Sequence, residues 1–262
     1  MASGFIPADR QKRIQRLLQE RGVVKVTDLS TMLGVSEITI RRDLDTLERN
    51  GDLERTHGGA VYNQRMRIEP RYAQKDAIHR EEKEAIGRAA ARLVEAGDTL
   101  LINSGSTTKQ VIRSLKMSKV RIITSNLGAV IEAQESEMEL ILIGGLLRSQ
   151  SNSLVGSLAT LSLQQVYGSK AFIGVDGLSV KYGLTTPILE EAEIAREMIR
   201  RTPGPVVVVA DHSKLSVVSN FMTAPINQVD MLVTDQGLNN ELREELEKIG
   251  IKVIIADLNP QI

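Results

Sequence analysis

Residues 35–44 read VSEITIRRDL, and this stretch decides how the N-terminal part of the chain folds. Ser36 is a good N-cap, because its hydroxyl can accept a hydrogen bond from a free backbone N–H of the first helical turn. Asn50-Gly51 supplies a C-terminal stop, so the spacing predicts a helix of about 14 residues between the two signals.

The predicted helix has two unlike faces. At about 100° per residue, Ile40, Leu44 and Leu47 fall on one apolar stripe. The opposite side is mainly basic and carries Ile38, Arg41, Arg42, Asp45 and Arg49. This arrangement fits a recognition helix that enters the major groove of DNA by its N-terminus. The alternative is a charged amphipathic helix of any α-helical domain.

The segments around this helix favour a winged helix-turn-helix. Thr27-Asp28 can cap a second short helix, and Gly34 opens the kind of tight connection that helix-turn-helix motifs use. Two β-prone runs surround Gly58-Gly59, as expected for a β-wing with a Gly-Gly turn. With a first helix between Pro7 and Gly22, the sequence predicts an α+β winged helix-turn-helix domain over residues 1–62.

Composition excludes several classes of protein. The chain has 262 residues, 42% of them hydrophobic, which suffices for two domains with ordinary cores. Residues 1–80 carry 15 Lys/Arg against 11 Asp/Glu, a net charge of +4, which favours a polyanionic partner at that end. Without cysteine there is no disulfide or thiolate metal site, and three scattered histidines argue against a histidine-based one. We therefore expect no metal and no cofactor.

The chain also lacks the apolar segments of exported or membrane proteins. The N-terminus has no signal-type apolar core, and no apolar run approaches the ~20 residues that span a bilayer. We expect a soluble cytoplasmic protein with no membrane partner.

Between residues 63 and 80 the apolar periodicity fades, which predicts a linker. Its cations belong either to a solvated loop or to direct phosphate contacts; they are Arg65, Arg67, Arg71, Lys75 and Arg80. From residue 81 onward strands and helices alternate, which predicts an α/β domain over residues 81–262.

The predicted strands of this domain are 99–103, 120–124, 139–143, 171–176, 206–210, 229–234 and 251–256. The predicted helices are 82–94, 107–115, 127–134, 190–200 and 239–249. Four consecutive valines at 206–209 indicate a strand that is buried on both faces, as in a parallel sheet with helices on either side.

The residues that follow each strand are the candidates for ligand binding, because ligands of open α/β sheets lie outside the carboxyl ends of the strands. After the first strand comes a loop rich in hydrogen-bond donors: Asn103, Ser104, Gly105, Ser106, Thr107 and Thr108. Its backbone N–H groups, hydroxyls and helix N-terminus can cradle a phosphate. The glycine and lysine spacings of a P-loop and of a dinucleotide motif are absent, and a plain strand-to-helix turn is the alternative.

Three further strand ends carry specialised residues. Gly144 and Gly145 permit close backbone approach, and Arg148 beside them can make a bidentate contact. Asp176-Gly177 can accept sugar hydroxyls. After the valine-rich strand comes the set Asp211, His212, Ser213 and Lys214, in which the lysine can pair with an anion and the histidine can titrate near neutrality. Each of these segments is also compatible with an ordinary surface turn.

Together these motifs resemble the DeoR-type family of bacterial sugar-catabolism regulators along nearly the whole chain. The most specific match is residues 35–44 with residues 55–60, RTHGGA. The further matching segments, in order, are 97–99, 105–108, 144–148, 211–214 and 234–235. The resemblance implies a repressor with a sensor domain that is related in fold to ribose-phosphate isomerases and sugar-phosphate deaminases. It also implies release by a phosphorylated sugar or polyol, and a homo-oligomer, either dimer or tetramer.

The chain departs from the family pattern at three positions. The family commonly has Asp at Asn103, Thr-Asn at Thr124-Ser125 and lysine at Ala195. These exchanges remove a carboxylate and an amine near the expected ligand site, so the identity of the effector stays open.

The leading hypothesis is therefore a DNA-binding repressor of a carbohydrate or polyol operon. On it, Arg41, Arg42 and Arg49 contact phosphates or base edges, and Ile38 can touch a thymine methyl. The full expected DNA-contacting set is Ser36, Glu37, Ile38, Thr39, Arg41, Arg42, Asp45, Arg49, His57 and Gly58.

Two other functions compete with this hypothesis. One is an active sugar-phosphate isomerase or deaminase with an N-terminal appendage, but the isomerases' Asp-Gly-Ala-Asp motif is absent, since the chain has Asp-Gly-Leu-Ser at 176–179. We therefore expect no enzyme. The other is a regulator whose ligand site is vestigial.

Overall fold

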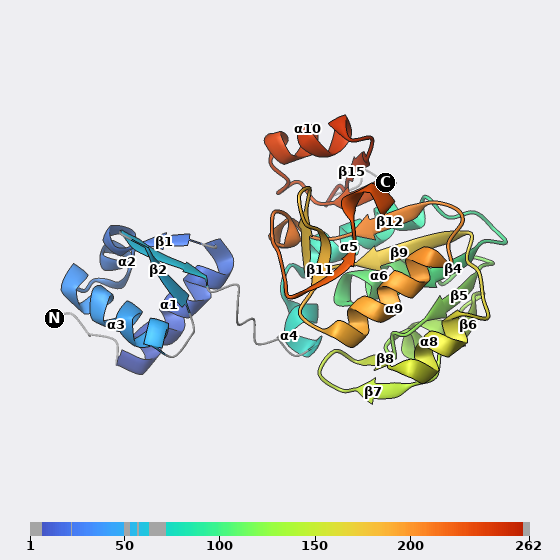
Figure 1. The fold of residues 1–262 in the computed structure, drawn as a ribbon, viewed down its shortest axis with the longest axis horizontal. Helices are drawn as coiled ribbons and strands as arrows, with labels where there is room; N and C mark the ends of the chain where they lie inside the picture. The colour runs from blue at the N-terminus through green and yellow to red at the C-terminus, as the bar shows by residue number, and fades with distance from the viewer. Residues whose placement is uncertain (1–6, 22, 50–52, 57, 63–71, 259–262) are drawn as a thin grey trace. The chain divides into compact units, whose positions relative to one another are not determined.

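The computed structural model describes residues 7–21, 23–49, 53–56, 58–62 and 72–258 (Figure 1). The chain divides into two compact units, residues 1–68 and 69–262. Each unit has its own hydrophobic core, and each is described separately below.

The N-terminal unit is a winged helix-turn-helix. Its elements are α1 (Pro7–Arg21), β1 (Val23–Lys25), α2 (Val26–Leu33), α3 (Glu37–Arg49), β2 (Leu53–Thr56) and β3 (Gly59–Tyr62). Among the described residues of this unit, the strands form an antiparallel sheet in the order β1-β3-β2. β1 pairs with β3, with Val23 opposite Val61.

Helix α3 has the faces that its sequence predicts. Ile40, Leu44 and Leu47 are buried in the core of the unit, whereas Ile38 is 66% exposed. The Ser36 Oγ accepts a hydrogen bond from the Thr39 backbone N–H at 3.3 Å, which confirms the N-cap.

Two local predictions were wrong. α2 begins at Val26, directly after β1, so its N-cap is Lys25 and not Thr27. Gly59 is a strand residue of β3 and not part of a turn, because it lies between β1 and β2 in the sheet. A Cβ at Gly59 would lie 1.9 Å from the Val24 carbonyl oxygen, so this position has room only for glycine.

The sequence did not predict a buried ion pair that joins α1 to the recognition helix. Arg10 Nε donates to Asp43 Oδ2 at 2.5 Å, and Arg10 Nη2 donates to Asp43 Oδ1 at 3.2 Å. The two side chains are 9% and 6% exposed. Asp43 thus lies within residues 35–44, but it fixes α3 to the domain instead of facing outward.

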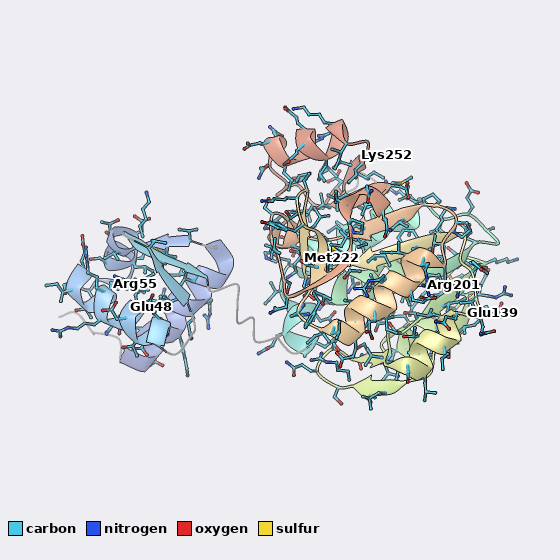
Figure 2. The ribbon with its side chains drawn as sticks, viewed as in Figure 1. Glu48, Arg55, Glu139, Arg201, Met222 and Lys252 are labelled. Atoms are coloured by element: carbon cyan, nitrogen blue, oxygen red, sulfur yellow. The ribbon has the colours of Figure 1, made fainter. Side chains whose placement is uncertain are left out.

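The wing is also tied to α3. The Arg55 backbone N–H of β2 donates to Glu48 Oε1 at 3.1 Å (Figure 2). The Arg55 guanidinium lies 3.5 Å from Asp45 Oδ1. Recognition helix and wing are therefore held as one surface.

Within residues 72–258, the C-terminal unit is built on a seven-stranded parallel sheet. The strands are β4 (Thr99–Ile102), β5 (Arg121–Thr124), β6 (Glu139–Leu142), β9 (Lys170–Gly174), β12 (Val206–Val209), β14 (Met231–Thr234) and β15 (Lys252–Ile255). All seven predicted strands are confirmed, and their order in the sheet is β15-β14-β12-β9-β4-β5-β6.

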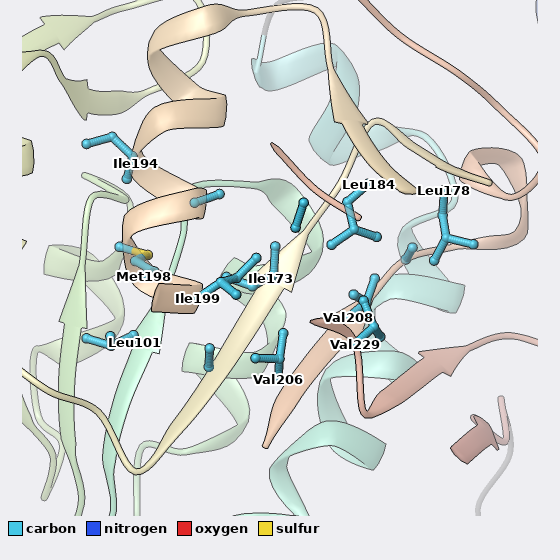
Figure 3. Packing of buried hydrophobic residues seen from close by; sticks show 14 of the residues in the cluster. Leu101, Ile173, Leu178, Leu184, Ile194, Met198, Ile199, Val206, Val208 and Val229 are labelled. Atoms are coloured by element: carbon cyan, nitrogen blue, oxygen red, sulfur yellow. The ribbon is translucent and has the colours of Figure 1, made fainter. Parts of the chain in front are cut away.

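The strands are buried on both faces because helices cover both sides of the sheet (Figure 1). One side holds α5 (Arg80–Ala91), α6 (Ser106–Ser114) and α7 (Ala129–Ala133), which pack with Leu100 and Val207. The other side holds α8 (Ser157–Leu163), α9 (Leu189–Arg200) and α10 (Asn240–Lys248), which pack with Leu101, Val206 and Val208 (Figure 3). Alternate residues of a strand thus serve opposite cores.

Several elements of this unit were not predicted. They are α4 (Tyr72–Ala77), α8, the hairpin β7 (Leu146–Arg148) and β8 (Ser153–Val155), and the small sheet of β10 (Gly177–Ser179), β11 (Gly183–Thr186) and β13 (Phe221–Ala224). α4 and the start of α5 lie inside the segment 63–80 that the sequence assigned to a linker. That assignment was wrong for residues 72–80, which contact the C-terminal unit.

The buried ion pair predicts a large effect of one substitution. Asp43→Ala would remove the carboxylate that pairs with the buried Arg10 guanidinium, at a cost of about 3–5 kcal/mol. Native-state hydrogen exchange of α1 and α3 amides in the full chain measures the loss. Glu37→Gln is the control, since it removes only the exposed pair with Arg41 and should cost about 0–1 kcal/mol. A loss below about 1 kcal/mol for Asp43→Ala would contradict the assignment.

Candidate functional site

The exposed face of α3 has the chemistry of a nucleic-acid interface. Ile38, Arg41 and Arg42 are all exposed, and Thr39 lies half-buried beside them. Glu37 pairs with Arg41 at 3.1 Å, with both side chains about half exposed. An exposed isoleucine between cations can contact a thymine methyl while the arginines reach phosphates or base edges.

Two of the other residues expected at this interface, Asp45 and Gly58, have contacts within the N-terminal unit. Asp45 is exposed but pairs with Arg55, so it positions the wing. Gly58 is exposed at the tip of the wing, and its carbonyl accepts a hydrogen bond from Val26 N–H at 2.9 Å. His57 and the Arg49 side chain lie outside the described residues.

In the C-terminal unit, the order of the strands locates a crevice between β4 and β9. The helix after β4, α6, covers one face of the sheet, whereas α9, between β9 and β12, covers the other. The connections therefore leave adjacent strands in opposite directions. Ligands of open α/β sheets bind at such a switch point, outside the carboxyl ends of the strands.

Asn103 joins the two strands at this point. Its Nδ2 donates to the Gly174 carbonyl at 2.9 Å, and its Oδ1 accepts from the Gly174 N–H at 2.8 Å. Thr108 Oγ1 in turn donates to the Asn103 carbonyl at 2.8 Å. The polar atoms of Asn103 and Thr108 thus build the loop, although both residues were predicted to bind the effector.

A cavity opens at the same point. It is lined by Tyr72, Lys75, Ile78, His79, Lys83, Asn103, Ser104, Gly105, Ser106, Thr107, Ser151, Gly174, Val175, Asp176, Thr186, Glu191, Ala195, Asp211, Lys214 and Thr223. Both signs of charge therefore meet around one cavity, next to the N-terminus of α6. That helix end offers backbone N–H groups to an anion.

Asp176 is one of the cavity carboxylates. Its Oδ1 accepts from Lys75 Nζ at 2.8 Å, and its Oδ2 accepts from Thr186 Oγ1 at 3.0 Å. Burial acts to raise the pKa of this carboxyl, but the charges of Lys75 and Lys214 and these hydrogen bonds hold it below its ordinary value. Asp176 is therefore ionised at neutral pH.

Asp211 is fully buried at the wall of the cavity. Its Oδ1 accepts from the backbone N–H and the hydroxyl of Ser213, and its Oδ2 has no hydrogen-bond partner among the described residues. Burial opposes ionisation, yet Lys214, Ser213 and Lys83 keep the pKa of Asp211 below its ordinary value. A buried, ionised oxygen without a partner is an acceptor for a ligand hydroxyl.

The cavity brings together part of the expected ligand set. The members that line it are Asn103, Gly105, Ser106, Thr107, Asp176, Asp211 and Lys214. The members that do not line it are Thr108, Gly144, Gly145, Arg148, Gly177 and His212.

Contacts explain why the second group is not in the lining. Gly145 packs on the Val155 backbone, where a Cβ would lie 2.6 Å from the carbonyl oxygen, and Gly177 packs on the Val217 backbone in the same way. Arg148 lies behind the lining, with its Nη1 donating to Ser151 Oγ at 3.0 Å. His212 Nδ1 lies 2.8 Å from Asp235 Oδ1.

Sequence reasoning missed the residues that α4 and α5 bring to the cavity, which are Tyr72, Lys75, His79 and Lys83. A search of strand ends could not find them, because they precede the first strand. The His79 ring packs edge-on against the His212 ring, with centroids 4.8 Å apart. The only signal was the presence of cations in the supposed linker.

Two of the departures from the family pattern can also be placed. Ala195 is buried at the cavity wall, so a lysine there would add a cation to the cavity. The neighbouring Arg196 does not line the cavity, and its Nη2 donates to the Met222 carbonyl at 2.6 Å. Ser125 is buried, and its carbonyl accepts from Leu154 N–H at 2.9 Å.

A winged helix-turn-helix joined to an α/β unit with a polar cavity is the organisation of a DNA-binding transcription regulator with a sensor domain. Residues 10–66 match the DeoR-like helix-turn-helix domain, and residues 78–236 match the DeoR C-terminal sensor domain. The chain belongs to the DeoR family of transcription regulators.

Relatives along the whole chain agree with this assignment. The chain is 36% identical over 251 residues to the HTH-type transcriptional regulator GlpR of Haloferax volcanii, covering 95% of this chain and 98% of that one. It is 33% identical over 253 residues to the putative aga operon transcriptional repressor of Escherichia coli O157:H7, covering 95% and 94%. The relatives are thus named as regulators, in agreement with the family.

Among solved structures, ribose 5-phosphate isomerase A of Methanocaldococcus jannaschii matches 52% of this chain and 55% of its own, with a TM-score of 0.39 and 20% identity.

In the part of the chain that the structure describes, no helix is both long and apolar enough to cross a membrane.

The double hydrogen bond of Asn103 predicts the effect of restoring the family's aspartate. Asn103→Asp removes the donor to the Gly174 carbonyl and places a carboxylate against it, which should cost about 1–3 kcal/mol. Hydrogen exchange of β4 and β9 amides measures this. The matched control is Asn239→Asp, because Asn239 acts only as an acceptor at the N-cap of α10 and an aspartate serves there equally well. Equal effects of the two substitutions would contradict the assigned role of Asn103.

Proposed function

We propose that this regulator represses a carbohydrate or polyol operon and leaves its operator when a phosphorylated sugar or polyol occupies the cavity of the sensor unit. The proposal has two parts: a surface that reads DNA, and a cavity that reads a ligand. Each part is supported by different residues, so each can be tested alone.

The DNA part rests on α3 and the wing. Its described contact residues are Ser36, Glu37, Ile38, Thr39, Arg41, Arg42 and Gly58, with Asp45 acting through Arg55. The arginines supply the phosphate affinity, and Ile38 with Thr39 supplies the base contacts. One such helix reads a half-site only, so we also propose that the chain acts as a homo-oligomer, a dimer or a tetramer.

The ligand part rests on one observation: cations and unsatisfied carboxylate oxygen lie around the same cavity at the switch point of the sheet. Lys75, Lys83, Lys214 and the α6 N-terminus suit a phosphate. Asp211 and Asp176 suit hydroxyl groups. A molecule with one anionic group and several hydroxyls satisfies both sets, which is the chemistry of a phosphorylated sugar or polyol.

The sign of regulation follows the names of relatives. The Escherichia coli relative is named as a putative repressor of the aga operon, and GlpR is named as a transcriptional regulator. In a repressor, the ligand must bind the DNA-releasing arrangement better than the DNA-bound one.

For the DNA surface, Arg42→Ala is the informative substitution. If Arg42 meets a phosphate, the salt dependence of operator binding should flatten by about one counterion. If it reads a base, discrimination at one position should fall by about 1–3 kcal/mol. Titration of a duplex selected from a random library, at several salt concentrations, separates the two. The control is Arg92→Ala, an exposed arginine of the C-terminal unit. Unchanged affinity at every salt concentration would remove Arg42 from the interface.

For the cavity, calorimetry against ribose 5-phosphate, glucosamine 6-phosphate and other sugar and polyol phosphates should find a binder, and the unphosphorylated forms should not bind. Lys214→Gln should weaken that binder by about ten- to a hundredfold, because a charge-assisted hydrogen bond is lost. The same ligand should lower operator affinity. A panel without any binder would favour a vestigial site, and turnover of a sugar phosphate would favour the enzyme.

A further inference from the structure

Helix α4 lies between the two family matches. The helix-turn-helix match ends at residue 66, and the sensor-domain match begins at residue 78. It is nevertheless part of the C-terminal unit and contributes Tyr72 and Lys75 to the cavity lining. In sequence it is the first described element after the segment that leads from the DNA-binding unit. In sequence, α4 therefore connects the DNA-binding unit to the unit that holds the proposed ligand cavity.

Polar contacts hold α4 in place, since each of its six residues is at least partly exposed. Lys75 Nζ donates to Asp176 Oδ1 at 2.8 Å, and Asp76 Oδ2 accepts from Lys109 Nζ at 3.0 Å. The Tyr72 backbone N–H donates to the Gln150 carbonyl at 2.8 Å. A helix that is held by ion pairs instead of an apolar core responds to new charges nearby, because those charges act directly on the pairs that hold it.

Lys83 connects α4 to the floor of the cavity. It is 4% exposed, and its Nζ donates to the carbonyls of Lys75 and Ile78 at 2.5 Å each. Burial lowers the pKa of Lys83, while the nearby Asp211 acts to raise it. The ammonium thus couples the C-terminal end of α4 electrostatically to the buried carboxylate.

We propose that α4 completes the ligand site and is its responsive element: an anionic group in the cavity pairs with Lys75 and holds α4 more firmly on the C-terminal unit. This inference rests on the proposed ligand site. Lys75 then pairs with the ligand as well as with Asp176, and the anion bridges Lys75 to the N-terminus of α6. Ligand occupancy is thereby felt at the segment that leads to the DNA-binding unit.

Hydrogen exchange of the full chain, followed by mass spectrometry, tests this with inorganic phosphate as the probe and chloride of equal ionic strength as the reference. Phosphate should slow the amides of 72–77 about fivefold, the ratio expected when one partly buried ion pair is added. It should also slow the amides of 105–109. In chloride alone, Asp176→Asn should speed the amides of 72–77, because the ion pair between Lys75 and Asp176 is lost.

Lys75→Met separates the role of α4 from the existence of the anion site. The substitution keeps the apolar stem of the side chain and removes the ammonium, in a helix with no buried residue. The variant should still show phosphate protection at 105–109 and lose it at 72–77. Lys119→Met, at an exposed lysine outside the cavity, should behave as the unsubstituted chain.

Protection at 105–109 without any response of 72–77 in the unsubstituted chain overturns the role of α4 and leaves the ligand site standing. A response of 72–77 that survives Lys75→Met overturns it as well. If phosphate changes neither segment, the anion site and this inference both fail, while operator binding is unaffected.

Discussion

The C-terminal unit depends on one topological constraint: β4 and β9 are adjacent parallel strands, and the connections that follow them cover opposite faces of the sheet. Adjacent parallel strands that send their connections to opposite faces of a sheet cannot close the space beyond their carboxyl ends. Asn103 fixes the two ends against each other through the backbone of Gly174. The loop before α6, the Asp176 turn and the Asp211 turn then converge on one cavity.

The charges at this cavity are better explained by ligand binding than by stability. Desolvating charged groups costs several kcal/mol each, and a buried ion pair does not reliably recover this. Lys83 and Asp211 are nonetheless buried, and one oxygen of Asp211 has no partner among the described residues. Buried groups with a shifted pKa and an unsatisfied polar atom cluster at functional sites. A ligand that supplies both an anion and hydroxyl groups would satisfy them.

Much of the fold could be predicted from the sequence because its signals are local. The seven strands of the parallel sheet are continuous apolar runs, and the stripe of Ile40, Leu44 and Leu47 sets the buried face of α3. The predictions failed where distant residues decide the structure. Arg10 and Asp43 are 33 positions apart, and Lys75 and Asp176 are 101 positions apart. No local pattern marks α4 as part of the sensor unit, because polar contacts and not an apolar stripe hold it in place.

On the proposed function, ligand and operator compete through one equilibrium of the same protein. Thermodynamic linkage requires this coupling to be equal in both directions. The most direct measurement is the affinity of the full chain for the proposed phosphorylated ligand, determined with and without saturating operator duplex. Operator should weaken ligand binding by the same factor by which ligand weakens operator binding. Equal ligand affinities in the two conditions would contradict it.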